Sequence, residues 1–195
     1  MESQYYRTFI GLPLRVEPPF LKARRDLIRS FEGERISWTN PEQYHVTLRF
    51  IGDTDLSSVE RIGSELQAGI SVPAPLRLDA GNLDSFGPRK KPRVIWVGFE
   101  ESVFFESLKS EVDRVLQGCG IPVTEQPFRA HLTLGRVRKL HDLRNYYDTL
   151  DAMGRKFCSP VLLEKLVFFR SILGPGGPEY RVLNEILFKH EIKPF

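Results

Sequence analysis

Two stretches of this sequence match each other: Pro41-Glu42-Gln43-Tyr44-His45-Val46-Thr47-Leu48 and, 86 residues later, Pro127-Phe128-Arg129-Ala130-His131-Leu132-Thr133-Leu134. In each stretch a proline stands four residues before a histidine, which is followed by an aliphatic residue, a threonine and a leucine. Side chains two residues apart in a strand point to the same face of a sheet. Each stretch therefore predicts a strand with an imidazole and a hydroxyl on one face and aliphatic core residues on the other.

An ordinary half-buried strand, with a histidine that happens to lie on its polar face, has the same pattern. The repetition argues against that interpretation, because two of only four histidines occur in these stretches, each at the same distance from a proline. We therefore interpret His45 and His131 as a functional pair. The other two, His141 and His190, lack the motif and are expected at the surface.

Strand-like and helix-like segments alternate along the rest of the chain. Strands are predicted at residues 6–12, 36–38, 44–51, 76–80, 94–99, 131–137, 161–171 and 180–189. Helices are predicted at residues 18–31, 59–69, 102–118 and 143–153, with a loop rich in glycine, proline and cations at 81–93. Each half holds strands, helices and one copy of the repeated stretch. The predicted fold class is α+β: one domain over residues 1–195, made of two related lobes, each an antiparallel sheet packed on helices.

The composition favours a reduced compartment. The chain has two cysteines, Cys119 and Cys158, without the spacing of a metal site or a CxxC motif. A chain of this length buries roughly 70% of its unfolded surface and needs no disulfides. The polar N-terminus shows no signal peptide, and no apolar run approaches the ~20 residues that span a membrane. We expect a cytoplasmic protein that does not enter a membrane.

Charge alone says little about the partner, because 28 basic residues stand against 25 acidic ones. The cations are clustered, however: four lie within residues 89–93, and Arg136, Arg138 and Lys139 directly follow the second stretch. Such a run is either a solvated loop or a surface that attracts a polyanion.

Two imidazoles on opposite sides of one reacting atom can act together as a general base and a general acid. One accepts a proton from the attacking nucleophile, while the other donates a proton to the leaving group. The hydroxyls of Thr47 and Thr133 can donate to oxygens on which negative charge builds, although threonine is also simply common in strands. The stretches lack the additional carboxylates or imidazole of a hydrolytic zinc site. We therefore expect neither a metal ion nor another cofactor.

The paired motifs at residues 45–48 and 131–134 resemble the signature motifs of the 2H phosphoesterases. Flanking segments narrow the resemblance to one branch, the RNA 2′,3′-cyclic phosphodiesterases, also called 2′-5′ RNA ligases. These segments are residues 7–13, 92–98, 168–171 and 174–178. The resemblance covers nearly the whole chain in the expected order.

This resemblance implies two sheets that face each other across an active-site cleft under pseudo-twofold symmetry, with one histidine from each. It implies that His45 is the proton donor and His131 the acceptor in opening an RNA 2′,3′-cyclic phosphate to a 2′-phosphate. The reverse reaction would form a 2′-5′ linkage. The family also places a phosphate-binding arginine at position 136. Strict alternation puts Arg136 on the face opposite His131, so this role requires a bulge near Gly135 or the end of the strand there.

Some features leave alternatives open. Phe9 or Phe128 would suit stacking on a base, although Phe9 also fits a core aromatic. The substrate is expected to be RNA ends or nucleotides that carry a cyclic phosphate. Two interpretations compete with this one. The protein could be a phosphodiesterase for another cyclic or 2′-5′-linked nucleotide, or a nucleotide- or RNA-binding module without turnover. Since two lobes complete one cleft, a monomer would suffice.

Overall fold

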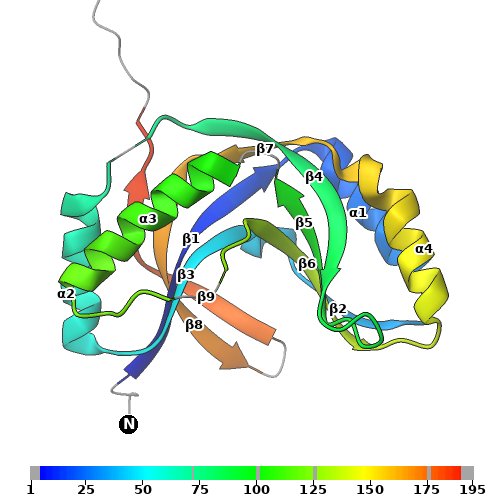
Figure 1. The fold of residues 1–195 in the computed structure, drawn as a ribbon, viewed down its shortest axis with the longest axis horizontal. Coiled ribbons are helices and arrows are strands. Elements are labelled where there is room, and N and C mark those ends of the chain that lie inside the picture. Colours follow the sequence, from blue (N-terminus) through cyan, green and yellow to red (C-terminus); the bar gives the residue numbers. More distant parts are fainter. Residues whose placement is uncertain (1–4, 72, 100–101, 125–126, 175–176, 190–195) are drawn as a thin grey trace, which may run out of the picture.

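A computed structural model describes residues 5–71, 73–99, 102–124, 127–174 and 177–189, and it shows a mixed α+β fold (Figure 1). The strands are β1 (Tyr5–Val16), β2 (Arg35–Trp38), β3 (His45–Asp55), β4 (Leu76–Phe86), β5 (Val94–Phe99), β6 (His131–Lys139), β7 (Pro160–Leu163), β8 (Lys165–Gly174) and β9 (Gly177–Leu187). The α-helices are α1 (Pro18–Ser30), α2 (Leu56–Gly69), α3 (Ser102–Gly118) and α4 (Leu143–Met153). Short 3₁₀ turns are η1 (Pro41–Gln43) and η2 (Gly154–Phe157).

All strand pairs are antiparallel, in the order β2-β6-β5-β4-β7-β1-β8-β9, and β3 pairs with both β1 and β6. The predicted α+β class with antiparallel sheets is therefore confirmed. The two expected sheets are joined directly, because β3 and β6 pair at Val46 and Leu132. Through β7 the pairings close a circuit that runs β1-β3-β6-β5-β4-β7 and back to β1. The two repeated stretches thus lie side by side at the centre of the molecule.

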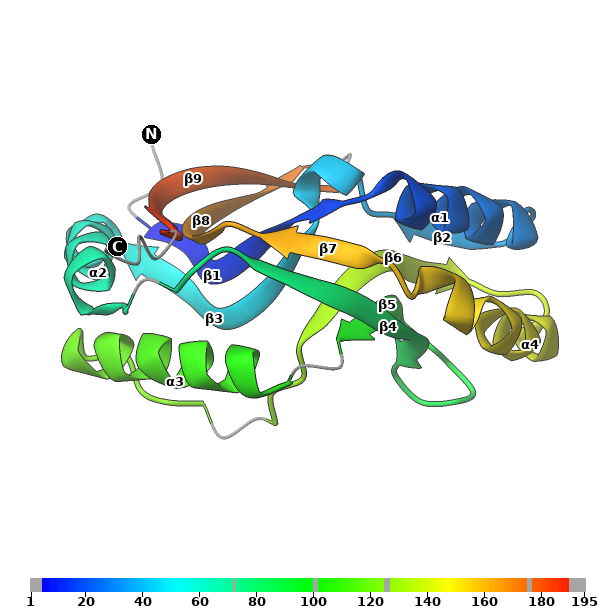
Figure 2. The same ribbon diagram turned by 90° about the horizontal axis from the view of Figure 1, so that it is seen from above.

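The four helices form two pairs outside the strands, α1 with α4 and α2 with α3. Each pair takes one helix from each half of the chain. Figure 2 shows α1 diagonally opposite α3, and α2 diagonally opposite α4, as a pseudo-twofold relation requires. One hydrophobic cluster draws buried residues from both halves, including Phe20, Leu66, Phe105 and Leu150. The halves are therefore interlocked by a common core.

Local sequence accounts for several helix starts. Asp55 caps α2, with its side-chain oxygen accepting from the backbone N–H of Ser58 at 2.9 Å. Asp142 caps α4 in the same way through Asn145, also at 2.9 Å. Helix α1 starts with two prolines, whose missing N–H groups are no loss in the first turn.

Several predicted boundaries were wrong, and three of them show the cause. Strand β1 continues past Pro13, because residues 14–16 pair with β7. Strand β4 extends to Phe86, into the expected loop, because residues 83–86 pair with β5. The single strand expected at 161–171 is two strands: β7 pairs with β1 and β4, whereas β8 pairs with β1 and β9. In each case the partner strand, and not local propensity, decides where the strand ends.

His141 lies just before α4 with an exposed side chain, as predicted, whereas His190 is outside the described residues. Within the described ranges, no helix combines the length and apolar character that crossing a bilayer requires.

Candidate active site

His45, Thr47, His131 and Thr133 lie on one face of the paired strands β3 and β6. The bridging residues Val46 and Leu132 point to the other face and are 0% and 1% exposed. Continuing this antiparallel register by one residue sets His45 opposite Thr133, and His131 opposite Thr47. The two histidines are then diagonal neighbours, which in a sheet lie about 7–8 Å apart. That spacing leaves room for one phosphoryl group between the imidazoles.

Both imidazoles are held in the same way by the backbone. Nδ1 of His45 donates to the carbonyl oxygen of Gln43 at 2.7 Å, and Nδ1 of His131 donates to that of Arg129 at 2.8 Å. A carbonyl only accepts, so in each neutral ring the proton is on Nδ1 and Nε2 carries the free lone pair. The 3₁₀ turn η1 supplies the Gln43 carbonyl. The two Nε2 atoms are thereby left as the reactive positions.

The surroundings favour neutral imidazoles. Burial lowers the pKa of His45, as do the positive charges of His131 and Arg136, while the Gln43 carbonyl opposes the shift. Burial also lowers the pKa of His131, together with the charges of Arg136 and Arg129. The charge of Arg136 thus lowers the pKa of both histidines, so the guanidinium interacts electrostatically with both rings.

Arg136 reaches this site because β6 contains a bulge. Gly135 pairs with Ile95, and Thr133 pairs with Trp96, so Leu134 is an extra residue between them. Leu134 and Gly135 are both buried, after which alternation returns Arg136 to the face of His131. The required bulge thus exists, one residue earlier than Gly135. No side chain would fit at Gly135, because a Cβ would lie 2.9 Å from the Trp38 ring.

The first copy has the same bulge but a different side chain. Gly11 pairs with Thr47 and Ile10 with Arg49, which leaves Leu48 as the extra residue. Phe50 then takes the place that Arg136 takes in the second copy. Its ring is 49% exposed, with the Arg7 guanidinium 4.8 Å from its centroid. The β6 side of the site therefore carries Arg136, whereas the β3 side carries an aromatic ring with a cation over it.

Aromatic rings support both histidines. The His45 ring lies 5.1 Å from Phe9, 5.1 Å from Tyr180 and 6.1 Å from Phe169. The His131 ring lies 4.8 Å from Phe86 and 6.1 Å from Trp96. These aromatic contacts restrict the orientation of both imidazoles and shield them partly from water.

Phe9 cannot stack on a base as the sequence suggested, and that prediction was wrong. Phe9 is 3% exposed, and it packs with Val167, Phe169 and Tyr180 in a small cluster of its own. The alternative of a core aromatic was the correct one. Phe128, the other proposed stacking residue, is half-buried and lines a pocket.

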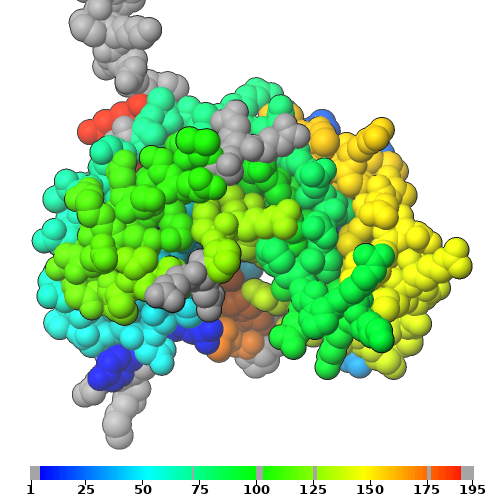
Figure 3. All heavy atoms as spheres, viewed as in Figure 1, coloured from blue at the N-terminus to red at the C-terminus, as the bar shows by residue number. Residues whose placement is uncertain are grey.

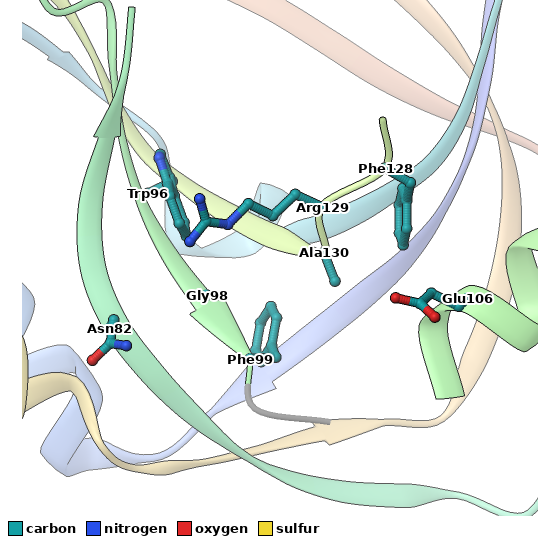
Figure 4. Close-up of a pocket in the computed structure, with 8 residues that line it drawn as sticks. All are labelled: Asn82, Trp96, Gly98, Phe99, Glu106, Phe128, Arg129 and Ala130. Carbon is teal, nitrogen blue, oxygen red and sulfur yellow. The ribbon is translucent and has the colours of Figure 1, made fainter. Parts of the chain in front are cut away.

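Two pockets lie beside the starts of β3 and β6. The larger, of about 670 Å³, includes His45, Gln43, Phe169 and Tyr180. The smaller, of about 310 Å³, is lined by Asn82, Trp96, Gly98, Glu106, Phe128 and Arg129 (Figure 4). Both volumes are of the order found for ligand sites, about 300–1,000 Å³.

Sequence reasoning missed several of these residues. Tyr180 and Phe86 carry no motif, and Trp96 lies in the segment 92–98, to which the sequence assigned no site role. Only the strand pairing brings the three rings to the histidines. The sequence could have suggested Arg129 as a site residue, since it stands two residues before His131. Its stacking on Trp96, however, depends on the position of β5. The cations of residues 89–93 lie in the β4–β5 connection, where the Arg89 guanidinium is 4.7 Å from the Tyr147 ring of α4. Within the described part of the chain, no three His, Cys, Asp or Glu side chains are grouped to hold a metal ion.

Comparison with known proteins agrees with this site. The family model for LigT-like phosphoesterases matches residues 10–96 and 103–180. An RNA 2′,3′-cyclic phosphodiesterase of Aeropyrum pernix is 32% identical over 155 residues, 79% of this chain and 87% of that protein. One from Thermotoga maritima is 27% identical over 188 residues, 94% of this chain and 96% of that protein.

Solved structures share the fold. The crystal structure of Escherichia coli LigT complexed with 3′-AMP has a TM-score of 0.69 at 14% identity, covering 95% of this chain and 99% of that one. TT0787 of Thermus thermophilus has a TM-score of 0.69 at 21% identity, with the same coverage of both chains. Taken with the match of the family model over most of the sequence, these similarities show that this chain belongs to the LigT-like phosphoesterase family, within the 2H phosphoesterase superfamily.

Proposed function

We propose that this protein hydrolyses the terminal 2′,3′-cyclic phosphate of RNA to a 2′-phosphate, with two histidines and no metal ion. The observation that carries the proposal is the arrangement of His45 and His131. Both lie on one face of adjoining strands, and each Nδ1 is fixed by a backbone carbonyl. The names of the relatives from Aeropyrum pernix and Thermotoga maritima support the same substrate.

In this mechanism, a water molecule attacks phosphorus on the side opposite the ribose 3′ oxygen. Neutral His131 accepts the water proton at Nε2 as the new P–O bond forms. The bond from phosphorus to the 3′ oxygen breaks, and protonated His45 donates its Nε2 proton to that oxygen. The product carries the phosphate on the 2′ oxygen, and a later exchange of protons with water restores both histidines.

His45 must be protonated to act as the acid, although burial lowers its pKa in the free protein. A bound phosphate brings negative charge next to the ring, which raises the pKa of His45 again. Substrate binding thus favours the protonated form of His45, which acts as the acid. The assignment of His45 as donor and His131 as acceptor follows the family resemblance.

Thr47, Thr133 and Arg136 would stabilise the charge that builds on the non-bridging oxygens. The two hydroxyls lie on the histidine face of β3 and β6, one from each lobe. The Arg136 guanidinium would complement the dianionic transition state, and losing one such donor typically slows catalysis by about 10²–10³-fold.

One chain supplies the whole cleft, which supports action as a monomer. Cys119 and Cys158 are free thiols, as is usual in the cytoplasm, where we expect the protein to work.

Product analysis tests the function. An oligoribonucleotide that ends in a 2′,3′-cyclic phosphate is incubated with the protein in excess EDTA, and the position of the product phosphate is determined. A 2′-phosphate formed at an undiminished rate is expected. A 3′-phosphate, or loss of turnover on chelation, would contradict the proposed mechanism.

A further inference from the structure

The two pockets beside the histidines are equivalent under the pseudo-twofold relation. Pro13 pairs with His45 and lines the larger pocket, whereas Gly98 pairs with His131 and lines the smaller one. Gln43 and Arg129 each stand two residues before a histidine, and each lines its own pocket. The fold therefore provides one recess beside the start of each strand that carries a motif histidine.

The two recesses differ in charge. In the larger pocket both cations are paired, Arg15 with Glu164 at 3.1 Å and Lys165 with Glu185 at 2.8 Å. Arg129 in the smaller pocket has no carboxylate partner within 4.0 Å among the described residues. Its guanidinium instead lies 4.3 Å from the Trp96 ring centroid. An exposed cation held flat on an aromatic ring keeps its N–H groups available for an anion.

The smaller pocket also has surfaces that suit a nucleoside. Phe128 provides a half-buried aromatic ring, and Gly98, which pairs with His131, contributes no side chain that would fill the recess. Figure 4 shows Glu106 on the opposite side of the pocket from the Arg129 guanidinium, where its carboxylate can accept from a ribose hydroxyl or a base amino group. In Figure 3 the segment leading into β6 is exposed between α3 and β4.

From these observations we infer that the smaller pocket is a subsite for the RNA nucleotide that adjoins the cyclic-phosphate terminus. Arg129 binds the phosphodiester that links this nucleotide to the terminal one, and Phe128 stacks on its base. This inference rests on the proposed function, because it assumes an RNA end at the two histidines. It predicts that the protein prefers an oligonucleotide to a single nucleotide.

Binding of two reaction products tests the subsite without turnover. A ribodinucleotide and a ribomononucleotide, each ending in a 2′-phosphate, are titrated calorimetrically at several salt concentrations. The dinucleotide should bind the wild-type protein at least about tenfold more tightly, since one charge-assisted hydrogen bond alone provides that factor. A plot of log Kd against log salt concentration should have a slope about 0.7 steeper for the dinucleotide than for the mononucleotide, which is the contribution of one phosphate on a single strand.

Arg129→Gln should weaken dinucleotide binding by about tenfold and remove its steeper salt dependence, with a smaller change in the mononucleotide Kd. This substitution introduces the residue that the equivalent position, Gln43, already carries, and it keeps the carbonyl that holds His131. Arg15→Gln is the matched control in the larger pocket and should leave the advantage intact. An equal loss for both ligands in Arg129→Gln, or loss of the advantage in Arg15→Gln, would overturn the subsite.

The base contact is tested separately. Phe128→Leu keeps apolar packing but removes the ring, and a dinucleotide that lacks the base of its first nucleotide removes the other partner. Base stacking on an aromatic side chain contributes about 5- to 150-fold in affinity. Each change alone should weaken binding, and the two together should weaken it no further. Additive losses would show that Phe128 does not contact that base.

The subsite and the proposed function fail in different ways. Absence of hydrolysis of a 2′,3′-cyclic mononucleotide by the wild-type protein would reject the function, whatever the binding data show. Hydrolysis without any preference for the dinucleotide would keep the function and reject the subsite.

Discussion

Gly11 lies against the ring of His45, and the contact leaves no room for a side chain. A Cβ at this position would be 2.9 Å from the carbonyl oxygen of Val46 and 3.4 Å from Cδ2 of His45. Strand β1 therefore approaches β3 more closely here than any other residue type would allow. A side chain at Gly11 would force β1 and β3 apart directly beside the imidazole.

Gly11→Ala should accordingly displace His45 and lower kcat on a 2′,3′-cyclic nucleotide by at least about tenfold, since small misplacements can slow an enzyme about 10²-fold. Gly63→Ala in α2 is the control, because its Cβ would meet Asn184 at an ordinary 3.6 Å. That variant should keep full activity and gain up to about 1 kcal/mol in unfolding free energy. Full activity in Gly11→Ala would show that the ring is not held from this side.

His45→Ala and His131→Ala should each lower kcat by at least about 10²-fold, because each removes one proton-transfer group. Circular dichroism and thermal unfolding would show that both variants still fold. His141→Ala is the matched control: its side chain is exposed, bonded to Glu34 and lines neither pocket. It should remain within about twofold of wild type. If either motif variant kept the wild-type rate, paired acid–base catalysis would be excluded.

The pH profile of kcat/KM should peak below pH ~6.5, the ordinary pKa of histidine. This follows because burial and nearby positive charge lower the pKa of both His45 and His131 in the free protein. The optimum of kcat/KM lies between the pKa values of the two histidines. Rates measured from pH 4.5 to 8.5 would show it, and an optimum above 7 would contradict the shifts.

Arg136→Gln should move this profile to higher pH and lower kcat by about 10²–10³-fold. The profile moves because one positive charge that lowers the pKa of both histidines is gone. The rate falls because a donor to the developing charge is lost. Arg138→Gln removes the neighbouring cation, whose Nε donates to the Ser37 hydroxyl at 3.1 Å. An equal shift of the profile in Arg138→Gln would mean that general surface charge, and not Arg136, acts on the histidines.

Asp113→Ala should lower the unfolding free energy by about 3–5 kcal/mol, because it leaves a buried cation without its partner. Asp113 in α3 lies 3.7 Å from Arg49 of β3 and 2.5 Å from Lys109, and Arg49 is 7% exposed. Urea unfolding measures the change. Asp26→Ala, which breaks an exposed pair with Lys22, should have a far smaller effect. Comparable losses in the two variants would show that Asp113 does not neutralise Arg49.

Local features of the sequence were sufficient for much of the fold. The cores of all four helices were predicted, as were the strands that carry His45 and His131, with their buried and half-buried faces. Alternation and helical periodicity are properties of neighbouring residues, so they can be read without knowing any distant contact. The resemblance to a known family rested on the same short strings.

By itself, then, the sequence determined the repeated strand with His and Thr on one face, the α+β class and the family. Only the tertiary structure decided that Val46 pairs with Leu132, that the bulge at Leu134 returns Arg136 to the cleft, and that Phe9 is buried. It also brought Tyr180 to His45 and placed Arg129 on Trp96. These features depend on register and packing between residues far apart in the chain, which no local pattern encodes.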